Sequence, residues 1–283
     1  MAVRSTHMLP SFFIIGANKC GTSSLYRYIL ANPGVLPCAR KEPNFFGQHS
    51  AAYIAGHIDE YFSLFPTYDY RGPLTFECEA SDEAGASSPT TIVVDRRPDG
   101  HYITGEASAN TFHDVSPSLL HQYLPDARLI VLLRNPVDRA YSHHRMYRRF
   151  KDAGHDLGIE IGEFEVDIRA EMAAHERGER TEYIAPGMYA ELLRGWIATY
   201  GANKVKVLMT EDLGQPPTAE QIMREIEDYL GLAAHDYANI LTRRFNRAAP
   251  ASVAPAVGSL LADFYRPHNE RLQEYLGREF DWG

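Results

Sequence analysis

Residues 12–26 read FFIIGANKCGTSSLY. The apolar run at 12–16 predicts a buried strand, and the stretch that starts at Thr22 predicts a helix. Gly16 and Gly21 bracket the turn between these two elements. A strand–turn–helix of this kind aims several backbone N–H groups and a helix N-terminus at one point, which favours an anion and most often a phosphate.

The position of the lysine separates this loop from the loop of nucleoside triphosphatases. Their loop reads G-x-x-x-x-G-K-[ST], with the lysine directly after the second glycine. Here the two glycines have that spacing, but Thr22 takes the lysine position and Lys19 lies inside the loop. The sequence therefore predicts a phosphate cradle without a magnesium-bound γ-phosphate. Its donors are Lys19, Gly21, Thr22, Ser23 and Ser24.

The overall composition predicts a globular protein that does not bind nucleic acid. The chain has 283 residues, is 45% hydrophobic and carries a net charge of −9, which is unsuited to polyanions. No apolar run reaches the roughly 18 residues of a membrane span. Residues 1–10 lack a signal-peptide core, and we expect a disordered tail or a cloning remnant there. The three cysteines show no disulfide or zinc spacing, which favours a reducing cytoplasm.

Strand and helix patterns along the chain predict one α/β domain over residues 11–283. The apolar runs at 127–133 and 204–209 are typical of central parallel strands. Their alternation with helices predicts a P-loop-like three-layer sandwich, in which helices flank a mostly parallel sheet. The polar, turn-rich segment 80–101 is expected to be an exposed loop between two strands. The expected helices cover 22–31, 117–124, 137–151, 163–177, 187–200, 217–230, 254–264 and 267–277.

Arg134 and Ser142 predict a second anion site. Arg134 follows the strand at 127–133, at the sheet edge where open α/β proteins bind ligands. Ser142 lies in the following helix, so a guanidinium and a hydroxyl can converge on a second phosphate. The alternative for Arg134 is an ion pair with Asp138. The same helix carries a group of basic residues, which forms either a solvated face or a surface that attracts an anionic acceptor or cofactor. They are Arg139, His143, His144, Arg145, Arg148, Arg149 and Lys151.

Glu42 is a candidate general base. It lies in Lys41-Glu-Pro-Asn-Phe-Phe46, where two aromatic residues can partly desolvate the carboxylate and raise its pKa. The alternative is a helix-capping or loop-surface glutamate. Glu106 is a rival carboxylate, and several histidines are rival bases, although no His/Cys or His/Ser/Asp spacing selects one of them. These histidines are His101, His113, His121, His143 and His144.

Together these segments resemble the sulfotransferases that use 3′-phosphoadenosine 5′-phosphosulfate (PAPS). The loop from Gly16 to Ser24 resembles their 5′-phosphosulfate loop, and LIVLLRNPVDRAYS at 129–142 resembles their 3′-phosphate motif. Four further stretches resemble the Golgi heparan sulfate branch, the N-deacetylase/N-sulfotransferases and 3-O-sulfotransferases, in a bacterial-like cytoplasmic version. They are residues 41–46, 185–189 with Trp196, 246–250 and 279–282. The resemblance extends over about residues 12–282.

The resemblance implies sulfuryl transfer from PAPS to the hydroxyl of a sugar or a small-molecule alcohol, without a metal. Glu42 would be the general base, and Lys19 would stabilise the leaving phosphate. The implied cofactor ligands are Lys19, Cys20, Gly21, Thr22, Ser23, Ser24, Arg134, Ser142, Tyr189 and Arg247. The implied acceptor contacts are Glu42, Asn44, Phe45, Ala107 and Ser108. The alternatives are a P-loop kinase or nucleotide-binding protein on the same fold, and a non-catalytic binding homologue.

The chain departs from the heparan sulfate branch at charged positions. Ala107 stands where a lysine follows the glutamate in that branch, so contacts with phosphosulfate or acceptor must differ. Phe245 stands where the cofactor segment begins with lysine, and Arg243 or Arg244 is the candidate substitute. The disulfide-bonded hairpin before this segment is missing. The segment 80–101 is longer than in that branch, which predicts a differently shaped acceptor site.

Overall fold

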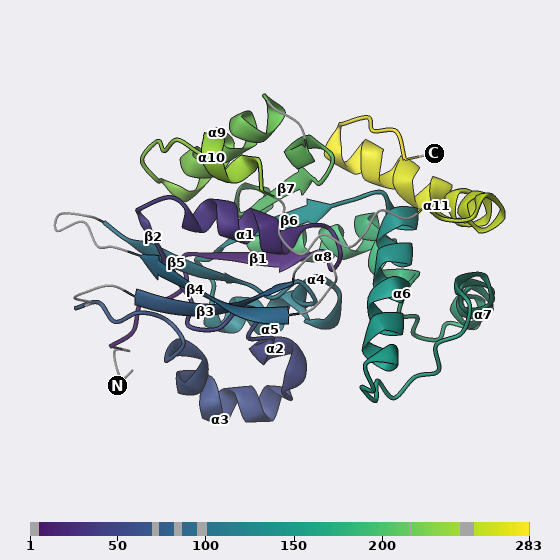
Figure 1. The fold of residues 1–283 in the computed structure, drawn as a ribbon, viewed down its shortest axis with the longest axis horizontal. Helices are drawn as coiled ribbons and strands as arrows, with labels where there is room; N and C mark the ends of the chain where they lie inside the picture. Colours follow the sequence, from purple (N-terminus) through teal and green to yellow (C-terminus); the bar gives the residue numbers. More distant parts are fainter. Residues whose placement is uncertain are drawn as a thin grey trace. The chain divides into compact units, whose positions relative to one another are not determined.

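A computed structural model describes residues 6–69, 74–81, 87–94, 101–214, 217–243 and 252–282 (Figure 1). The chain divides into two compact units. We call Met1–Ala17, Gly21–Leu132 and Trp196–Ala249 the sheet unit, and Asn18–Cys20, Leu133–Gly195 and Pro250–Gly283 the helical unit. Among the described helices, none is long and apolar enough to cross a membrane.

The sheet unit is built on a five-stranded parallel sheet in the order β2-β5-β1-β6-β7. Strand β1, at the centre, is buried along its whole length because FFIIG offers an apolar side chain to both faces of the sheet. It pairs with β5 through Phe13 and Glu106 and with β6 through Phe13 and Leu129. The predicted α/β fold is confirmed. The strands are β1 Phe12–Gly16, β2 Val35–Pro37, β5 Ile103–Ala107, β6 Arg128–Leu133 and β7 Val205–Met209.

Helices cover both faces of this sheet. The connections β1-α1-β2 and β5-α5-β6 run in opposite directions along the strand order, so right-handed crossovers place α1 and α5 on opposite faces. Figure 1 shows α1 and α9 on one side and α4 and α5 on the other. These helices are α1 Thr22–Leu30, α4 Thr111–Asp114, α5 Pro117–Tyr123 and α9 Thr218–Leu230, and the short helices are η2 Ala202–Lys204, η3 Asp212–Gly214 and α10 Ala238–Leu241.

The expectation of a loop over 80–101 is wrong in part. Strands β3 (Leu74–Ser81) and β4 (Ser87–Val94) form an antiparallel ribbon, paired from Leu74 with Val94 to Ser81 with Ser87. The polar start of β4, SSPTT, resembles a turn in the sequence, whereas its end, IVV, is typical of a strand. Residues 82–86 and 95–100, also in the expected loop, lie outside the described residues.

Helices α2 (Phe45–Gln48) and α3 (Ala51–Phe62) were not predicted from the sequence. Helix α3 contains a non-helical residue, His57, and a glycine before it, which weaken the apolar periodicity.

The N-terminal segment 1–10, which was expected to be a tail, is described from residue 6 onwards. There His7 forms a β-bridge with Thr67.

The helical unit contains α6 (Pro136–Asp152), α7 (Phe164–Glu176), η1 (Ala185–Gly187), the start of α8 (Tyr189–Tyr200) and α11 (Pro255–Leu276). Its core joins α6, α7 and α11. The prediction of two helices at 254–264 and 267–277 is wrong, because α11 continues through Pro267. Proline removes one helical hydrogen bond, but buried residues before and after it hold the helix together: Val257, Leu261, Tyr265 and Leu272.

Candidate functional site

The β1–α1 loop has the backbone that an anion cradle requires. Lys19 and Gly21 adopt positive φ values of 70° and 89°. Gly21 is the N-cap of α1 and provides no side-chain cap. Its carbonyl accepts the N–H groups three and four residues later, so the N–H groups of Thr22 and Ser23 have no acceptor within the helix. Both donors lie at the positive end of the helix dipole.

Gly16 permits the strand to enter this loop. A Cβ atom there would clash with the Phe112 Cβ and lie 3.0 Å from the Ala109 carbonyl oxygen. Any larger residue would therefore push β1 away from α4. The glycine at this position has a packing reason that is independent of any ligand.

In the helical unit, Lys19 lies along one face of α6. Its carbonyl oxygen accepts a hydrogen bond from the Arg134 guanidinium at 3.5 Å, and its ammonium lies 3.2 Å from the Met146 sulfur. Within α6, Asp138, Ser142 and Met146 follow one another at intervals of four residues, which is the spacing of side chains along one helix face, and Arg134 precedes the helix. Lys19 therefore contacts Arg134 just before α6 and Met146 within it, and Ser142 lies one turn before Met146 on the same face of the helix.

Arg134 also forms the ion pair that was its alternative interpretation. Its guanidinium lies 3.5 Å from the Asp138 carboxylate, and the two side chains are 32% and 55% exposed. An exposed pair at this distance is weak. The ion pair therefore leaves Arg134 able to turn toward a bound anion.

The segment Arg134-Asn135-Pro136 ends β6 and begins α6. The Asn135 side chain caps the helix by accepting the Val137 N–H at 2.9 Å, and Pro136 occupies the first turn. Both residue types are preferred at these positions. The segment thereby fixes Arg134 at the carboxyl end of a buried strand.

Tyr189 ties the loop to the end of β6. Its buried hydroxyl donates to the Arg134 carbonyl oxygen at 2.9 Å and lies 3.7 Å from the Cys20 sulfur. Burial raises its pKa well above the usual range. The Trp282 ring packs against Tyr189, and the Trp282 carbonyl accepts from the Asn135 side chain. These contacts favour a role for Tyr189 in holding the loop in place, rather than in contacting a ligand directly.

In the sheet unit, Glu42 lies in a tight turn before α2. Glu42 and Asn44 have φ values of 50° and 51°, in the left-handed region that residues with side chains rarely adopt. The Asn44 side-chain amide donates to the Glu42 carbonyl oxygen at 3.1 Å. The Glu42 carboxylate lies 3.2 Å from the Lys41 ammonium, and its side chain is 35% exposed. It is therefore accessible to an acceptor.

Glu106, the rival carboxylate, is buried on β5 with 1% exposure. One carboxylate oxygen accepts the Tyr61 hydroxyl at 2.9 Å, and the other accepts the Ser108 hydroxyl at 2.5 Å. Burial raises its pKa to about 7; these hydrogen bonds lower it and the charge of Glu42 raises it. The Ser108 oxygen accepts the Asn44 N–H at 2.9 Å. Glu106 is thus linked through Ser108 and Asn44 to the backbone carbonyl of Glu42.

The predicted acceptor contacts fall into two groups. Glu42 and Asn44 are partly exposed, whereas Phe45, Ala107 and Ser108 are buried. Tyr61 was not singled out in the sequence because the helix that carries it, α3, was not predicted. Phe245, Arg244 and the proposed cofactor ligand Arg247 lie outside the described residues, and the Arg243 carbonyl accepts the Tyr28 hydroxyl at 2.7 Å.

The rival histidines, apart from the exposed His101, contact protein groups. His144 lies 3.1 Å from the Asp167 carboxylate, and His113 lies 3.5 Å from Asp114. The ring of His121 packs against Tyr200, and the buried ring of His143 packs against Tyr147. These contacts favour structural roles for the four.

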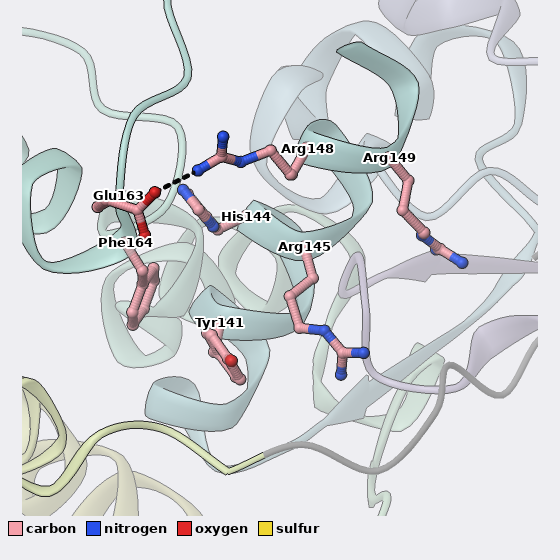
Figure 2. A pocket seen from close by; sticks show the side chains of 7 residues that line it. All are labelled: Tyr141, His144, Arg145, Arg148, Arg149, Glu163 and Phe164. Carbon is pink, nitrogen blue, oxygen red and sulfur yellow. Dashed lines mark hydrogen bonds and ion pairs between the residues drawn. The ribbon is translucent and has the colours of Figure 1, made fainter. Parts of the chain in front are cut away.

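A basic hollow of about 280 Å³ lies beside α6 in the helical unit (Figure 2). Arg148 pairs with Glu163 at 2.9 Å, and the Arg145 guanidinium lies 5.8 Å from the centre of the Tyr141 ring. In Figure 2, Arg145 and Arg149 point away from Glu163. Three guanidinium groups against one carboxylate favour an anionic ligand. The hollow is lined by Tyr141, His144, Arg145, Arg148, Arg149, Glu163 and Phe164.

Comparison with known proteins identifies the family. A model of the sulfotransferase family matches residues 10–236. Human carbohydrate sulfotransferase 15 is 25% identical over 97% of this chain and 54% of its own length. Mouse bifunctional heparan sulfate N-deacetylase/N-sulfotransferase 4 is 26% identical over 95% of this chain and 30% of its own length. The chain thus spans about half, or less, of these relatives.

A solved structure shows the same fold. A sulfotransferase from Alicyclobacillus acidocaldarius aligns with a TM-score of 0.65 and 23% identity, over 96% of this chain and 97% of that one. The family model covers well over half of the sequence. The chain therefore belongs to the sulfotransferase family.

Proposed function

We propose that the protein transfers a sulfuryl group from PAPS to an acceptor hydroxyl. The observation that carries this proposal is the position of Lys19 along α6. Its carbonyl accepts from Arg134 and its ammonium reaches Met146, and Ser142 lies one turn before Met146 on the same face of α6. Lys19 therefore belongs to the loop suited to one phosphate and contacts Arg134 of the motif suited to a second phosphate.

The donor groups fit a doubly phosphorylated nucleotide. Lys19 offers an ammonium, Arg134 a guanidinium with several donors, and Ser142 a hydroxyl. The first turn of α1 adds the N–H groups of Thr22 and Ser23. In the proposal, the loop binds the 5′-phosphate, and Arg134, Ser142 and Arg247 bind the 3′-phosphate. Tyr189 holds the loop in place from behind.

The transfer itself needs a base and a stabilised leaving group. Glu42 accepts the proton of the acceptor hydroxyl while the new oxygen–sulfur bond forms. The bond between sulfur and the bridging phosphate oxygen breaks in line with it, and the Lys19 ammonium stabilises the negative charge on that oxygen. The bound donor supplies the sulfuryl group and departs as 3′-phosphoadenosine 5′-phosphate (PAP). Positioning and electrostatics account for most of the rate, as in phosphoryl transfer.

The proposed acceptor is the hydroxyl of a sugar or of a small-molecule alcohol. Two relatives carry carbohydrate or heparan sulfate in their names, which supports a glycan. The basic residues that line the hollow beside α6 support an acceptor or cofactor that carries negative charge. An acidic sugar should therefore have a lower KM than its neutral counterpart, and the difference should shrink as salt screens the arginines.

Calorimetry and a transfer assay test this function against the alternatives. We expect PAP to bind in magnesium-free buffer and ATP to bind weakly with or without magnesium. Mass spectrometry should detect sulfate transfer from PAPS to members of a panel of neutral and acidic sugars and alcohols. Magnesium-dependent ATP binding with phosphate transfer would identify a kinase. PAP binding without transfer to any acceptor would support a non-catalytic homologue.

A further inference from the structure

The burial of Glu106 needs an explanation. The carboxyl group is almost completely removed from solvent, and burying such a group costs several kcal/mol relative to an apolar side chain of similar size. Its neighbours on β1, at the centre of the sheet, are apolar. Stability of the sheet alone does not account for a carboxyl group at this position.

Two hydrogen bonds lead from Glu106 to the turn that carries Glu42. On one side Ser108 donates to Glu106 and accepts the backbone N–H of Asn44. On the other side Tyr61 donates to Glu106, and its ring packs against Phe45 and Phe46 with centroid distances of 5.4 and 4.9 Å. Glu106 is therefore connected to the turn at residues 42–46 through Asn44 and through the two phenylalanines that follow it.

The turn has a conformation that needs support. Glu42 and Asn44 both have left-handed backbones, at a cost of about 1–2 kcal/mol for a residue with a side chain. Asparagine tolerates this region, but glutamate gains nothing there from its own side chain. Such conformations persist where surrounding contacts hold them. The contact between Ser108 and the Asn44 N–H, together with the Asn44–Glu42 hydrogen bond, supplies that support.

We propose that Glu106 is a positioning residue which, through Ser108 and Tyr61, fixes the turn at 42–46 and with it the carboxylate of Glu42. The inference rests on the proposed function, in which Glu42 is the base. Both Glu106 oxygens are occupied by protein hydroxyls, and the side chain is buried. Glu106 thus acts through Glu42 and does not contact the acceptor.

The test is a Ser108→Ala variant, which breaks the link and leaves both carboxylates present. A misplaced base slows the chemical step, so kcat should fall between about 10-fold and 100-fold. The KM for PAPS and the Kd for PAP should stay unchanged, because those ligands are bound by other residues. Ser108→Thr keeps the hydroxyl and should recover most of the lost kcat.

A double variant shows whether the effect passes through Glu42. If Ser108 acts only by positioning Glu42, Glu42→Gln with Ser108→Ala should be no slower than Glu42→Gln alone. A further loss of the same size as in the single Ser108→Ala variant would overturn the inference. Tyr61→Phe provides an independent variant with the same shape, and its kcat should fall several-fold, with PAP binding again unchanged. An unchanged kcat in Tyr61→Phe would also count against the inference.

Thr104→Val is the matched control. Thr104 lies on the same strand, is fully buried, and its hydroxyl donates to the Leu36 carbonyl oxygen at 2.9 Å. The substitution should lower the unfolding temperature about as much as Ser108→Ala, with kcat unchanged. Normal kcat in Ser108→Ala together with an inactive Glu42→Gln would refute the positioning role and leave the proposed function intact. An active Glu42→Gln would instead remove the proposed base.

Discussion

The Tyr189 hydroxyl donates a hydrogen bond of 2.9 Å to the Arg134 carbonyl oxygen, at the point where β6 ends. The same hydroxyl lies against the Cys20 sulfur in the β1–α1 loop. One buried side chain at the start of α8 therefore holds two segments that are more than 100 residues apart in the sequence, from Cys20 to Arg134. Both segments contribute to the proposed PAPS site.

Removing this hydroxyl should loosen the loop. In Tyr189→Phe we expect the unfolding free energy to fall by about 1 kcal/mol, the usual effect of one lost hydrogen bond. The affinity for PAP should fall about 3-fold to 10-fold, because the loop donors are no longer held in place. Calorimetry with PAP and chemical unfolding measure the two effects. Tyr200→Phe is the control, because the buried Tyr200 hydroxyl has no hydrogen-bond partner among the described residues.

Substitutions of Arg134 and Asp138 should have different effects on nucleotide binding. Arg134→Ala removes a guanidinium from the proposed 3′-phosphate site, and the affinity for PAP should fall about 10-fold or more. Asp138→Asn removes the partner of the exposed ion pair, which also removes a negative charge near the anion. It should leave the affinity unchanged or raise it. Equal losses in the two variants would mean that the ion pair itself is what matters.

Substitutions of the two proposed catalytic residues should differ in their effects on sulfuryl transfer and on PAP binding. Glu42→Gln should bind PAP normally and lose transfer by about 100-fold or more, whereas Lys19→Met should lose both transfer and part of the affinity. Assays of the transfer rate with PAPS, together with calorimetry with PAP, distinguish the two patterns. Glu60→Gln and Lys206→Met in the sheet unit are the charge-matched controls; Glu60 is exposed, and the Lys206 ammonium pairs with Glu225. Full transfer in Glu42→Gln would contradict the assignment of the base.

The local sequence was sufficient to predict a strand, turn or helix wherever the pattern lay within one segment of the chain. The run FFIIG, the two loop glycines and the Asn-Pro pair after Arg134 each specify a local structure by burial, backbone freedom or capping. These features predicted β1, α1, β6 and α6 within a residue or two. The contact between Lys19 and Arg134, which joins the two motifs, is consistent with the sequence because both flank neighbouring parallel strands.

Contacts between distant segments could not be predicted in the same way. The importance of Ser108 depends on the backbone N–H of Asn44, and that of Tyr61 depends on Glu106. Neither pair has a spacing that a helix or strand would impose. The β3–β4 ribbon was missed because strand pairing, and not local propensity, stabilises a strand that begins with polar residues.

The buried Glu106 should also make stability depend on pH. Its pKa is raised from 4.5 to about 7 in the folded protein, chiefly by burial. A carboxyl group with a raised folded-state pKa binds its proton more tightly when folded. The stability that it contributes is therefore fully present below about pH 4.5 and is lost as the pH rises through 7. At about 1.4 kcal/mol per pKa unit, the total change is on the order of 3 kcal/mol.

Chemical unfolding at about pH 5 and about pH 8 measures this effect, with Glu106→Gln as the comparison. Glutamine has nearly the same shape and does not titrate, so its variant should lose less stability than the wild type between the two pH values. Other groups titrate equally in both proteins and cancel in the difference. Parallel losses in the two proteins would mean that Glu106 keeps its charge at low pH, and that hydrogen bonds from Ser108 and Tyr61 outweigh its burial.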